Sequence, residues 1–379
     1  MSKKITIIGG GISGLYLAYK LSTSSTSNPT STITILEKNN YLGGRIFTHR
    51  EQIENQSVSM ECGAGRLGSR DAQKLLWNLL DSSGLTDKVV QISTTSNTFD
   101  ALLQRLKRFT DEQLMNSTIT QLIGDIDPNI FGYDAEFNCM NALYARDYIQ
   151  RHFIRNHYYL QGGLDQIVKA IVQRLKNVRI LTGSYVYELN QTYCRLRDGT
   201  LIQHDYVYIT IPPRNYLNLR FPSVLKDTIF NLNTSVQPVA LCRLFVGVRN
   251  SQNLTSPFGD VGKLVHSGPI RMFFVLKTYP TFTSCQIYTD SKWAKWWNEQ
   301  GDRTDVIASE LQKIFNVNIE VTYHRKAFWR NGVHVWKKGY SNKSINQKPF
   351  SWVSICGEAV SKESQGWIEG ALESVESVL

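Results

Sequence analysis

Three glycines near the start of the chain have the spacing of a dinucleotide-binding loop. Gly9, Gly11 and Gly14 form a G-x-G-x-x-G sequence, with Ile12 and Ser13 before the third glycine. In such a loop the first glycine permits a tight turn, the second lets the backbone approach a pyrophosphate, and the third lets helix and strand pack closely. The spacing therefore predicts a binding loop for the phosphates of a dinucleotide.

The segments on both sides of the loop have the order that such a site needs. A β-rich run at 5–8 precedes the glycines, and a helical apolar pattern through Leu21 follows them. After the polar loop "STSSTSNPTST", a second extended run ends on Glu37, with Lys38 behind it, about where a ribose-binding acid belongs. Since the helix N-terminus then faces the phosphates, this context makes the glycine spacing a strong signal.

The composition favours a large globular chain with an anionic ligand. With 379 residues, of which 42% are hydrophobic, the chain is long enough to form two domains with buried cores. Its formal net charge of +10 favours an anionic ligand or partner, such as a cofactor phosphate or an acidic substrate. No nucleic-acid-binding module accompanies this charge, so we expect no nucleic-acid partner.

Cysteine, histidine and hydropathy patterns argue against several other classes of site. The six cysteines are scattered without a C-x-x-C pair, which predicts neither a zinc site nor a disulfide framework and favours a reducing, cytoplasmic location. His152 and His157 lack a partner at metal-ligand spacing, so we expect no metal. The N-terminal run imitates a signal peptide, but its glycines interrupt the apolar stretch. No apolar run is long enough to cross a bilayer, so we expect no membrane anchor.

A second glycine pair follows Glu37, and here the sequence resembles the flavin-dependent amine oxidase superfamily. The stretch "NNYLGGRIFTH" contains Gly43, Gly44 and Arg45, and members of that family carry a G-G-R segment just behind the second strand. The resemblance implies that the glycines bring backbone close to the pyrophosphate of FAD and that the arginine adds positive charge there. Val333 stands near where some relatives carry a cysteine that links the flavin, so the FAD is expected to be noncovalent.

Four further stretches extend the resemblance along the chain. "ECGAGRLG" resembles the acidic, glycine-rich loop beside the isoalloxazine, and "YLQGGLDQIVKAIVQRLKNVRILTGSYVYEL" resembles the segment that re-enters the FAD domain. "HDYVYITIPP" resembles a family strand that ends on prolines, and "SICGEAVSKESQGWIEGALESV" resembles the C-terminal flavin motif. The cofactor-binding positions that these stretches imply are Gly63, Ala64, Gly65, Arg66, Val186, Gly357, Glu358, Gly366, Trp367 and Ile368.

The C-terminal motif continues into a helix whose apolar residues share one face. Ile368, Ala371, Leu372 and Val375 recur at helical spacing, and three glutamates fall outside this stripe, which predicts one apolar face to bury. The resemblance implies that the helix N-terminus faces the pyrimidine end of the flavin, where backbone N–H groups can stabilise negative charge. Trp367 would then form one wall of the substrate cavity; the alternative is a core or capping aromatic.

Two features resemble the L-amino-acid oxidase branch of the family in particular. Arg66 matches the arginine that binds the substrate carboxylate in that branch, and a bidentate guanidinium–carboxylate contact would orient an amino acid. The alternative is that Arg66 neutralises an FAD phosphate or forms an internal salt bridge. A Gly-Trp pair in the C-terminal motif is also typical of that branch. A second aromatic wall is expected from "FWRNGVHVWKKG", with His334 or Trp336 as the candidate.

One position departs from the family pattern. Relatives usually carry a lysine at the start of a strand that returns to the flavin, where it is hydrogen-bonded through water to N5 and linked to oxygen reactivity. In "SVQPVALCRLFVGV" the best register puts Pro238 at that position, and proline cannot donate that bond. Arg243 lies on the same strand, without an argument that it reaches the ring. The sequence therefore supports FAD binding more strongly than amine oxidation.

The expected fold class is α/β, with a Rossmann-like FAD-binding domain built from discontinuous segments. These segments are 1–70, 156–215 and 340–379, and an α+β substrate-binding domain is expected from 71–155 and 216–339. Helical apolar spacing in the first insertion covers 71–85, 99–109 and 136–153. The second insertion mixes extended runs at 239–248 and 270–279 with helices at 292–297 and 306–315. The tryptophans at 293, 296 and 297 are read as packing residues.

The function that the resemblance implies is oxidation of the C–N bond of an amine or L-amino acid. A hydride would pass to flavin N5, with O2 as the expected acceptor and a small molecule as the substrate. One alternative is an FAD-dependent desaturase-like or renalase-like dehydrogenase of the same fold, since such relatives manage without the lysine. Another is an FAD-binding protein with a structural or assembly role and no amine oxidase activity.

Overall fold

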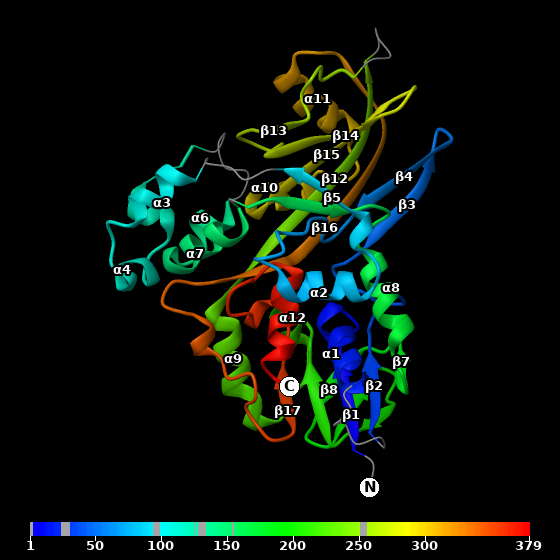
Figure 1. Ribbon diagram of the computed structural model, residues 1–379, viewed down its shortest axis with the longest axis vertical. Helices are drawn as coiled ribbons and strands as arrows, with labels where there is room; N and C mark the ends of the chain where they lie inside the picture. Colours follow the sequence, from blue (N-terminus) through cyan, green and yellow to red (C-terminus); the bar gives the residue numbers. More distant parts are fainter. Residues whose placement is uncertain are drawn as a thin grey trace.

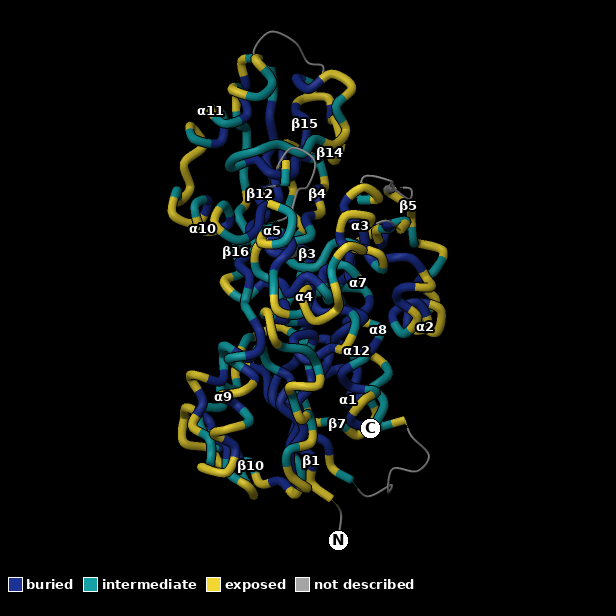
Figure 2. The backbone as a smooth tube through the Cα atoms, turned by 90° about the vertical axis from the view of Figure 1, so that its left-hand side faces the viewer, coloured by how far each residue is buried: buried dark blue, intermediate teal, exposed yellow. Residues whose placement is uncertain are grey.

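The computed structural model describes residues 3–23, 31–93, 99–124, 126–127, 134–153, 155–250 and 256–379, so the polar loop expected at 22–32 lies largely outside the described residues. Figure 1 shows an elongated molecule with two halves: one contains a parallel sheet and both chain termini, and the other an antiparallel sheet. Buried residues concentrate in the interior of both halves, whereas the outer helices and turns carry the exposed segments (Figure 2). The α/β fold class is confirmed.

A five-stranded parallel sheet forms the centre of the first half. Its strand order is β17-β11-β1-β2-β7, and Ile7 of β1 pairs with Tyr208 of β11 and Ile35 of β2. Such sheets are buried on both faces, and their strands are near-continuous hydrophobic runs. The strands are β1 Lys4–Ile8, β2 Thr32–Leu36, β7 Val178–Leu181, β11 Tyr206–Ile209 and β17 Val353–Ile355.

The strands of this sheet come from three separated parts of the chain. They lie within 1–70, 156–215 and 340–379, which are the segments expected to form the FAD domain; the exact boundaries stay a prediction. Leu15, Ile167 and Leu372 of three helices share one buried cluster with β1 and β2. These helices are α1 Ile12–Thr23, α8 Asp165–Arg174 and α12 Ile368–Glu376.

A second buried cluster lies on the other side of the parallel sheet. It joins β11 and β17 to a three-stranded antiparallel sheet and to α9, with Leu189, Leu232 and Trp336 among its members. The elements are β8 Val186–Leu189, β9 Tyr193–Leu196, β10 Leu201–Gln203 and α9 Lys226–Ser235, with 3-10 turns at Pro213–Asn218, Ser223–Leu225, Asn342–Ser344 and Glu358–Val360.

The second half is built on a five-stranded antiparallel sheet of order β13-β14-β15-β12-β16. Its two longest strands, β12 Val236–Asn250 and β16 Ile319–Trp336, pair along almost their whole lengths and run down to the first half (Figure 1). The register shifts between Val239 and Leu241 and again beyond Gly247. The other elements are β13 Lys263–Val265, β14 Met272–Thr278, β15 Thr283–Asp290, α10 Ser291–Glu299 and α11 Thr304–Phe315.

Each face of this sheet is covered by different elements. Trp297 of α10 and Leu311 of α11 are buried in one cluster with β12 and β15, so the packing role predicted for the tryptophans is confirmed for Trp297. On the other face, Met60 of the β3–β4 hairpin packs in one cluster with Phe245 of β12. The hairpin strands are β3 Thr48–Ile53 and β4 Gln56–Glu61.

A helical lobe supplies the remaining elements. The helix expected over 136–153 is two helices, since Asn141 caps the second one by accepting a hydrogen bond from the Tyr144 backbone N–H at 2.8 Å. The lobe and its neighbours comprise α2 Lys74–Ser82, Thr86–Lys88, β5 Val89–Ser93, α3 Asp100–Leu106, α4 Asp111–Met115, α5 Ile119–Ile123, α6 Ala135–Asn138, α7 Ala142–His152 and β6 His157–Leu160. Strand β6 pairs with β5 of the insertion.

The C-terminal helix is buried more completely than its apolar stripe predicts. All four stripe residues of α12 are buried, as expected, but Glu369 is also only 3% exposed. Its carboxylate accepts hydrogen bonds from the backbone N–H groups of Leu75 and Leu76 at 2.9 and 2.8 Å. Glu369 therefore accepts hydrogen bonds from backbone N–H groups in the first turn of α2, which has no side-chain cap of its own. The expectation of one buried face is wrong at this residue.

None of the helices within the described ranges combines the length and the apolar character that a membrane crossing requires.

Candidate functional site

The three glycines of the G-x-G-x-x-G loop meet different surroundings. A Cβ at Gly14 would lie 2.1 Å from the carbonyl oxygen of Gly9, and one at Gly9 would lie 2.7 Å from the Thr210 hydroxyl. A Cβ at Gly11, by contrast, would meet nothing within 4 Å. Packing of the helix on the strand therefore requires two of the glycines, whereas Gly11 faces open space that a ligand can fill. This space, at the start of α1, fits a pyrophosphate.

Glu37 stands at the end of β2 and is tied to the glycine loop. Its carboxylate accepts a hydrogen bond from the Gly10 N–H at 2.7 Å and another from the Asn39 N–H at 2.8 Å. Although only 5% exposed, it lines the same cavity as Gly11, beside Lys38. A carboxylate fixed in this way retains lone pairs for ribose hydroxyl groups.

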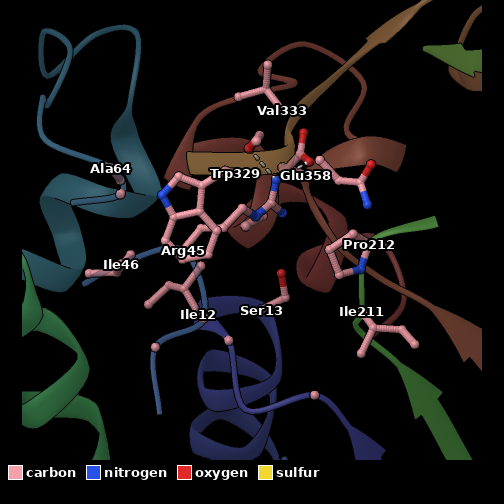
Figure 3. Close-up of a pocket in the computed structure, with 18 of the residues that line it drawn as sticks. Ile12, Ser13, Arg45, Ile46, Ala64, Ile211, Pro212, Trp329, Val333 and Glu358 are labelled. Carbon is pink, nitrogen blue, oxygen red and sulfur yellow. Dashed lines mark hydrogen bonds and ion pairs between the residues drawn. The ribbon is translucent and has the colours of Figure 1, made fainter. Parts of the chain in front are cut away.

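Arg45 links the G-G-R loop to two distant segments. Its Nη1 donates to the carbonyl oxygen of Gly332 at 2.7 Å and to Oε1 of Glu358 at 2.8 Å. In Figure 3 its guanidinium lies between Glu358 and Trp329, above Ile12 and Ser13 of α1. Since its Nη2 and Nε have no hydrogen-bond partner among the described residues, they remain available to an anion such as the FAD pyrophosphate.

Glu358 is the hub of a buried polar network. Its Oε1 also lies 2.6 Å from Nδ1 of His334, and its Oε2 accepts the Gly366 N–H at 2.9 Å. Burial alone would raise the pKa of this carboxyl, but the Arg45 charge and His334 hold the pKa at about 2. Glu358 is therefore ionised at every working pH, and it joins the G-G-R loop, β16 and the turn before α12.

One continuous cavity of about 490 Å³ connects these features to the second half. Most of the residues expected to bind cofactor line it, while Gly14 and Gly357 lie outside the lining. The expected residues in its wall are Gly9, Gly11, Ile12, Ser13, Glu37, Lys38, Gly43, Gly44, Arg45, Gly63, Ala64, Gly65, Arg66, Val186, Glu358, Gly366, Trp367 and Ile368. The wall thus extends from the nucleotide loop to the substrate-binding half, as an elongated dinucleotide requires.

Trp367 lies in the cavity wall at the start of α12, and contacts with three other ring side chains fix its position. Its indole N–H donates to the Tyr148 hydroxyl at 2.8 Å, and its ring stacks on His152 and His157 at centroid distances of 4.7 and 6.0 Å. Burial lowers the pKa of each histidine to about 3, so both rings are neutral. The indole is therefore a fixed, uncharged surface.

The second wall differs from the expected one. His334 and Trp336 are both fully buried and line no part of the cavity; His334 contacts Glu358, and Trp336 packs in the core cluster beneath β11 and β17. The prediction that one of them forms the wall is wrong. The same strand instead presents Trp329, whose indole N–H donates to the Cys62 carbonyl at 2.6 Å.

Pro238 also lies away from the cavity. It lines a separate pocket with Cys139 and Trp293. The residues of β12 that face the main cavity are Val239, Leu241 and Arg243. Among the described lining residues the only lysine is Lys38, so β12 contributes no lysine, whichever register is chosen.

Several lining residues have no clear signal in the sequence. Arg243, Tyr288 and Asp290 reach the cavity from neighbouring strands β12 and β15, where Arg243 pairs with Tyr288 and Leu241 with Asp290. Burial and the nearby Asp134 raise the pKa of Asp290, while the backbone N–H groups of residues 134 and 135 donate to its oxygens. Successive side chains of β12 point to opposite faces of the sheet. This alternation would identify Arg243 as a cavity residue if the sequence also told which face borders the cavity.

Metal and disulfide sites are not seen in the described ranges. No group of three metal-ligating side chains occurs there. No disulfide joins the six cysteines, all of which lie within the described ranges, and all but Cys139 are buried. The lack of a disulfide framework stays a prediction. None of the six lines the main cavity. The cytoplasmic location stays a prediction.

Comparison with known proteins gives consistent results. Residues 7–82 match the NAD(P)-binding Rossmann-like domain family, and residues 126–377 match the flavin containing amine oxidoreductase family. The flavin-dependent L-tryptophan oxidase RebO of Lentzea aerocolonigenes is 22% identical, over 98% of this chain and 96% of its own.

Solved structures with the same fold include three oxidases by description. Cyclohexylamine oxidase from Brevibacterium oxydans IH-35A superposes with a TM-score of 0.74 at 15% identity, covering 100% of this chain and 98% of its own. A redesigned putrescine oxidase gives 0.75 at 15% identity over the same shares. A putative protoporphyrinogen oxidase from Exiguobacterium sp. 255-15 gives 0.69 at 15%, covering 100% and 99%. At these identities the likeness shows the fold.

Proposed function

The chain belongs to the flavin containing amine oxidoreductase family, and from this premise we propose that it oxidises the C–N bond of an amine or L-amino acid with FAD as its cofactor. A single observation carries the proposal: one cavity joins a dinucleotide-binding loop to a wall that holds Trp367 and Arg66. An enzyme of this type needs a bound cofactor and a substrate to meet within one enclosed space.

The residues that would hold FAD are lining residues of the cavity, and each part of the cofactor is assigned to a different group of them. Val186 and Glu37 would take the adenosine end, and Gly11 and Arg45 the pyrophosphate, because open space and unused donors are found there. The start of α12 would lie at the flavin ring, because its first backbone N–H groups have no side-chain cap.

The substrate half of the cavity has the features that an amine substrate requires. When bound, FAD supplies the hydride acceptor at N5. Trp367 and Trp329 provide flat apolar surfaces that hold the substrate and exclude water, and Arg66 would grip a carboxylate. Because the histidines behind Trp367 are neutral, these two rings add no positive charge that would oppose a substrate amine.

We further propose that the FAD is held without a covalent bond. Covalent flavins are attached to a protein nucleophile, and no cysteine or histidine belongs to the described lining of the cavity. Val333 occupies the wall close to Gly366, where a Cβ at the glycine would lie 3.4 Å from the valine side chain. Release of free FAD on acid denaturation would support this assignment.

The side chains of β12 bear on the identity of the electron acceptor. O2 is the acceptor that the family resemblance implies, but the cavity-facing residues of β12 are Val239, Leu241 and Arg243 rather than a lysine. This observation favours a second candidate, a dehydrogenase of the same fold that passes electrons to another acceptor.

Anaerobic stopped-flow absorbance tests both candidates. The FAD-loaded protein is mixed with a panel of L-amino acids and polyamines, and air is then admitted. We expect one substrate class to bleach the flavin band, and Arg66→Ala to slow the bleaching by an amino acid by roughly 10- to 100-fold, the range for a lost charged hydrogen bond. Arg70→Ala is a matched control, since Arg70 is exposed and pairs with Asp81.

The recolouring rate then separates the two acceptors. Rapid recolouring in air indicates an oxidase, whereas slow recolouring with fast oxidation by an artificial acceptor indicates a dehydrogenase. If dithionite bleaches the flavin but no panel member does, amine oxidation is excluded for these donors, and a structural role for FAD becomes the better explanation.

A further inference from the structure

Arg243 is a buried guanidinium in the middle of the antiparallel sheet. It lies on β12 with only 8% of its surface exposed. Its Nη1 donates to the carbonyl oxygen of Glu61 at 2.8 Å, and the guanidinium lies 4.9 Å from the ring centre of Tyr288. These contacts fix the direction of the side chain but use only part of its donor capacity, because a guanidinium has five N–H groups.

The one other buried arginine among the described residues, Arg271, has a carboxylate partner, whereas Arg243 has none within ion-pair distance. Arg271 is 2% exposed and pairs with Asp134 at 3.0 Å. The nearest acid of β4, Glu61, uses its carboxylate to accept from the Leu164 N–H and the Thr48 hydroxyl instead. Burial raises the pKa of Glu61, and Arg243 lowers it only as a nearby charge.

The cavity wall makes room for this guanidinium. Arg243 lines the main cavity together with Gly65 and Arg66. A Cβ at Gly65 would lie 2.3 Å from Nη1 of Arg243, so the wall accepts the arginine only because this position is a glycine. Asp290, the acid on the neighbouring strand that shares the lining, is already bound by the backbone N–H groups of residues 134 and 135.

A buried charge without a counter-ion is costly, and a ligand of opposite charge that fills the cavity removes that cost. We propose that Arg243 binds a second carboxylate of the substrate, so that the preferred substrate is an amino acid or amine that carries an acidic side chain. The planar donor group suits a bidentate contact with such a carboxylate. This inference rests on the proposed function, in which Arg66 binds the first carboxylate.

Calorimetric titration tests the second site without requiring turnover. The FAD-loaded protein is titrated with glutarate, which has two carboxylates, and with glutaramate, in which one carboxylate is an amide. We expect glutarate to bind roughly 10- to 100-fold more tightly, the factor given by about 1.5 to 3 kcal/mol for a charged hydrogen bond. Arg243→Gln should remove this preference while leaving glutaramate binding unchanged.

A matched control comes from the same strand. Arg249→Gln removes the same charge from β12, but Arg249 pairs with Glu54 on the surface, so this variant should keep the wild-type preference. If Arg243→Gln fails to fold, Arg243→Lys serves instead: it keeps the charge and loses the bidentate geometry, so an intermediate preference is expected.

Three results would overturn the inference. Equal affinities of the wild type for the two probes would show that no second carboxylate site exists. An unchanged preference in Arg243→Gln, or in Arg243→Lys where that variant replaces it, would place the site elsewhere. Loss of binding of both glutarate and glutaramate in Arg243→Gln would mean that Arg243 binds the first carboxylate.

Flavin reduction separates this inference from the proposed function. If L-glutamate bleaches the flavin faster than L-glutamine does, both the proposed function and the acidic substrate class are supported. If neutral amino acids are the better donors, the function stands and the acidic substrate class is wrong. If no donor works but glutarate binding depends on Arg243, the carboxylate site stands and amine oxidation is wrong.

Discussion

At the scale of single residues, Gly11 and Gly14 belong to the same loop but differ in the space available to a Cβ atom. A Cβ at Gly11 meets no atom within 4 Å, whereas one at Gly14 lies 2.1 Å from a main-chain oxygen. We expect Gly11→Ala to leave the melting temperature of the apo-protein nearly unchanged and to weaken FAD binding at least tenfold. Gly14→Ala should destabilise the fold by roughly 3 kcal/mol or more, because backbone must move.

Thermal unfolding of the apo-proteins and fluorescence titration with FAD measure the two effects separately. A Gly11→Ala protein that binds FAD normally would show that the open space beside this residue is not the pyrophosphate site. A Gly14→Ala protein with wild-type stability would show that helix and strand can separate without cost, contrary to the packing described above.

The sequence predicts which residues line the cavity where a motif fixes the backbone, but not where the facing direction of a strand decides. The glycine loop, Glu37 and Trp367 all lie in the cavity wall because the local turn, strand end or helix start places them there. The stretch "FWRNGVHVWKKG" predicts His334 or Trp336 as the wall residue, but the residue in the wall is Trp329. Nothing local to the sequence reveals which side chains of a long strand face a cavity.

At the scale of elements, Glu369 couples the stability of the α12–α2 contact to pH. Burial raises the pKa of this carboxyl to about 7, while hydrogen bonds from the Leu75 and Leu76 backbone oppose the shift. Because the folded protein binds this proton more tightly than the unfolded chain, stability from this group is complete below about pH 4.5 and is lost as the pH rises to about 7. The expected loss is on the order of 2 to 3 kcal/mol.

Urea unfolding at pH 5 and pH 8 measures this dependence. Glu369→Gln cannot ionise but keeps an amide oxygen for one backbone N–H, so its stability should change less between the two pH values than that of the wild type. Glu363→Gln, which removes an acid paired with Arg151 at the surface, is the control and should follow the wild type. Parallel curves for wild type and Glu369→Gln would exclude Glu369 as the titrating group.

Element types were predictable, and some of their ends and faces were not. Apolar periodicity correctly located helices near 71–85, 99–109 and 306–315. The break between α6 and α7 follows from the Asn141 cap, a signal present in the sequence but hidden inside a longer apolar pattern. The burial of Glu369 depends on α2, which arrives from almost 300 residues earlier, so α12 alone could not reveal it.

At the scale of the whole molecule, the cavity unites the two ends of the chain and both sheets. Its wall contains Gly9 from the first strand–helix turn, Arg243 from the antiparallel sheet and Trp367 near the C-terminus. The order of these segments along the chain was predictable from the family resemblance. The lining from β12 was not, because the register of that strand shifts between Val239 and Leu241.

A cofactor that contacts all these segments should stabilise the whole fold against heat. Binding only to the folded state contributes about 2.7 kcal/mol at a free ligand concentration of 100 times Kd, which for a chain of this length raises the melting temperature by roughly 3 to 6 °C. We therefore expect FAD to produce a shift of this size in differential scanning calorimetry of the apo-protein.

ADP at the same concentration provides the comparison, because in the proposed arrangement it would fill only the part of the cavity between Val186 and Gly11. Its shift should be smaller, since ADP forgoes the contacts with Gly366, Trp367 and the start of α12 and binds less tightly. Equal shifts for ADP and FAD would mean that the flavin ring gains nothing from the second half of the cavity. The wall that holds Trp367 and Arg243 could then no longer be regarded as the place where flavin and substrate meet.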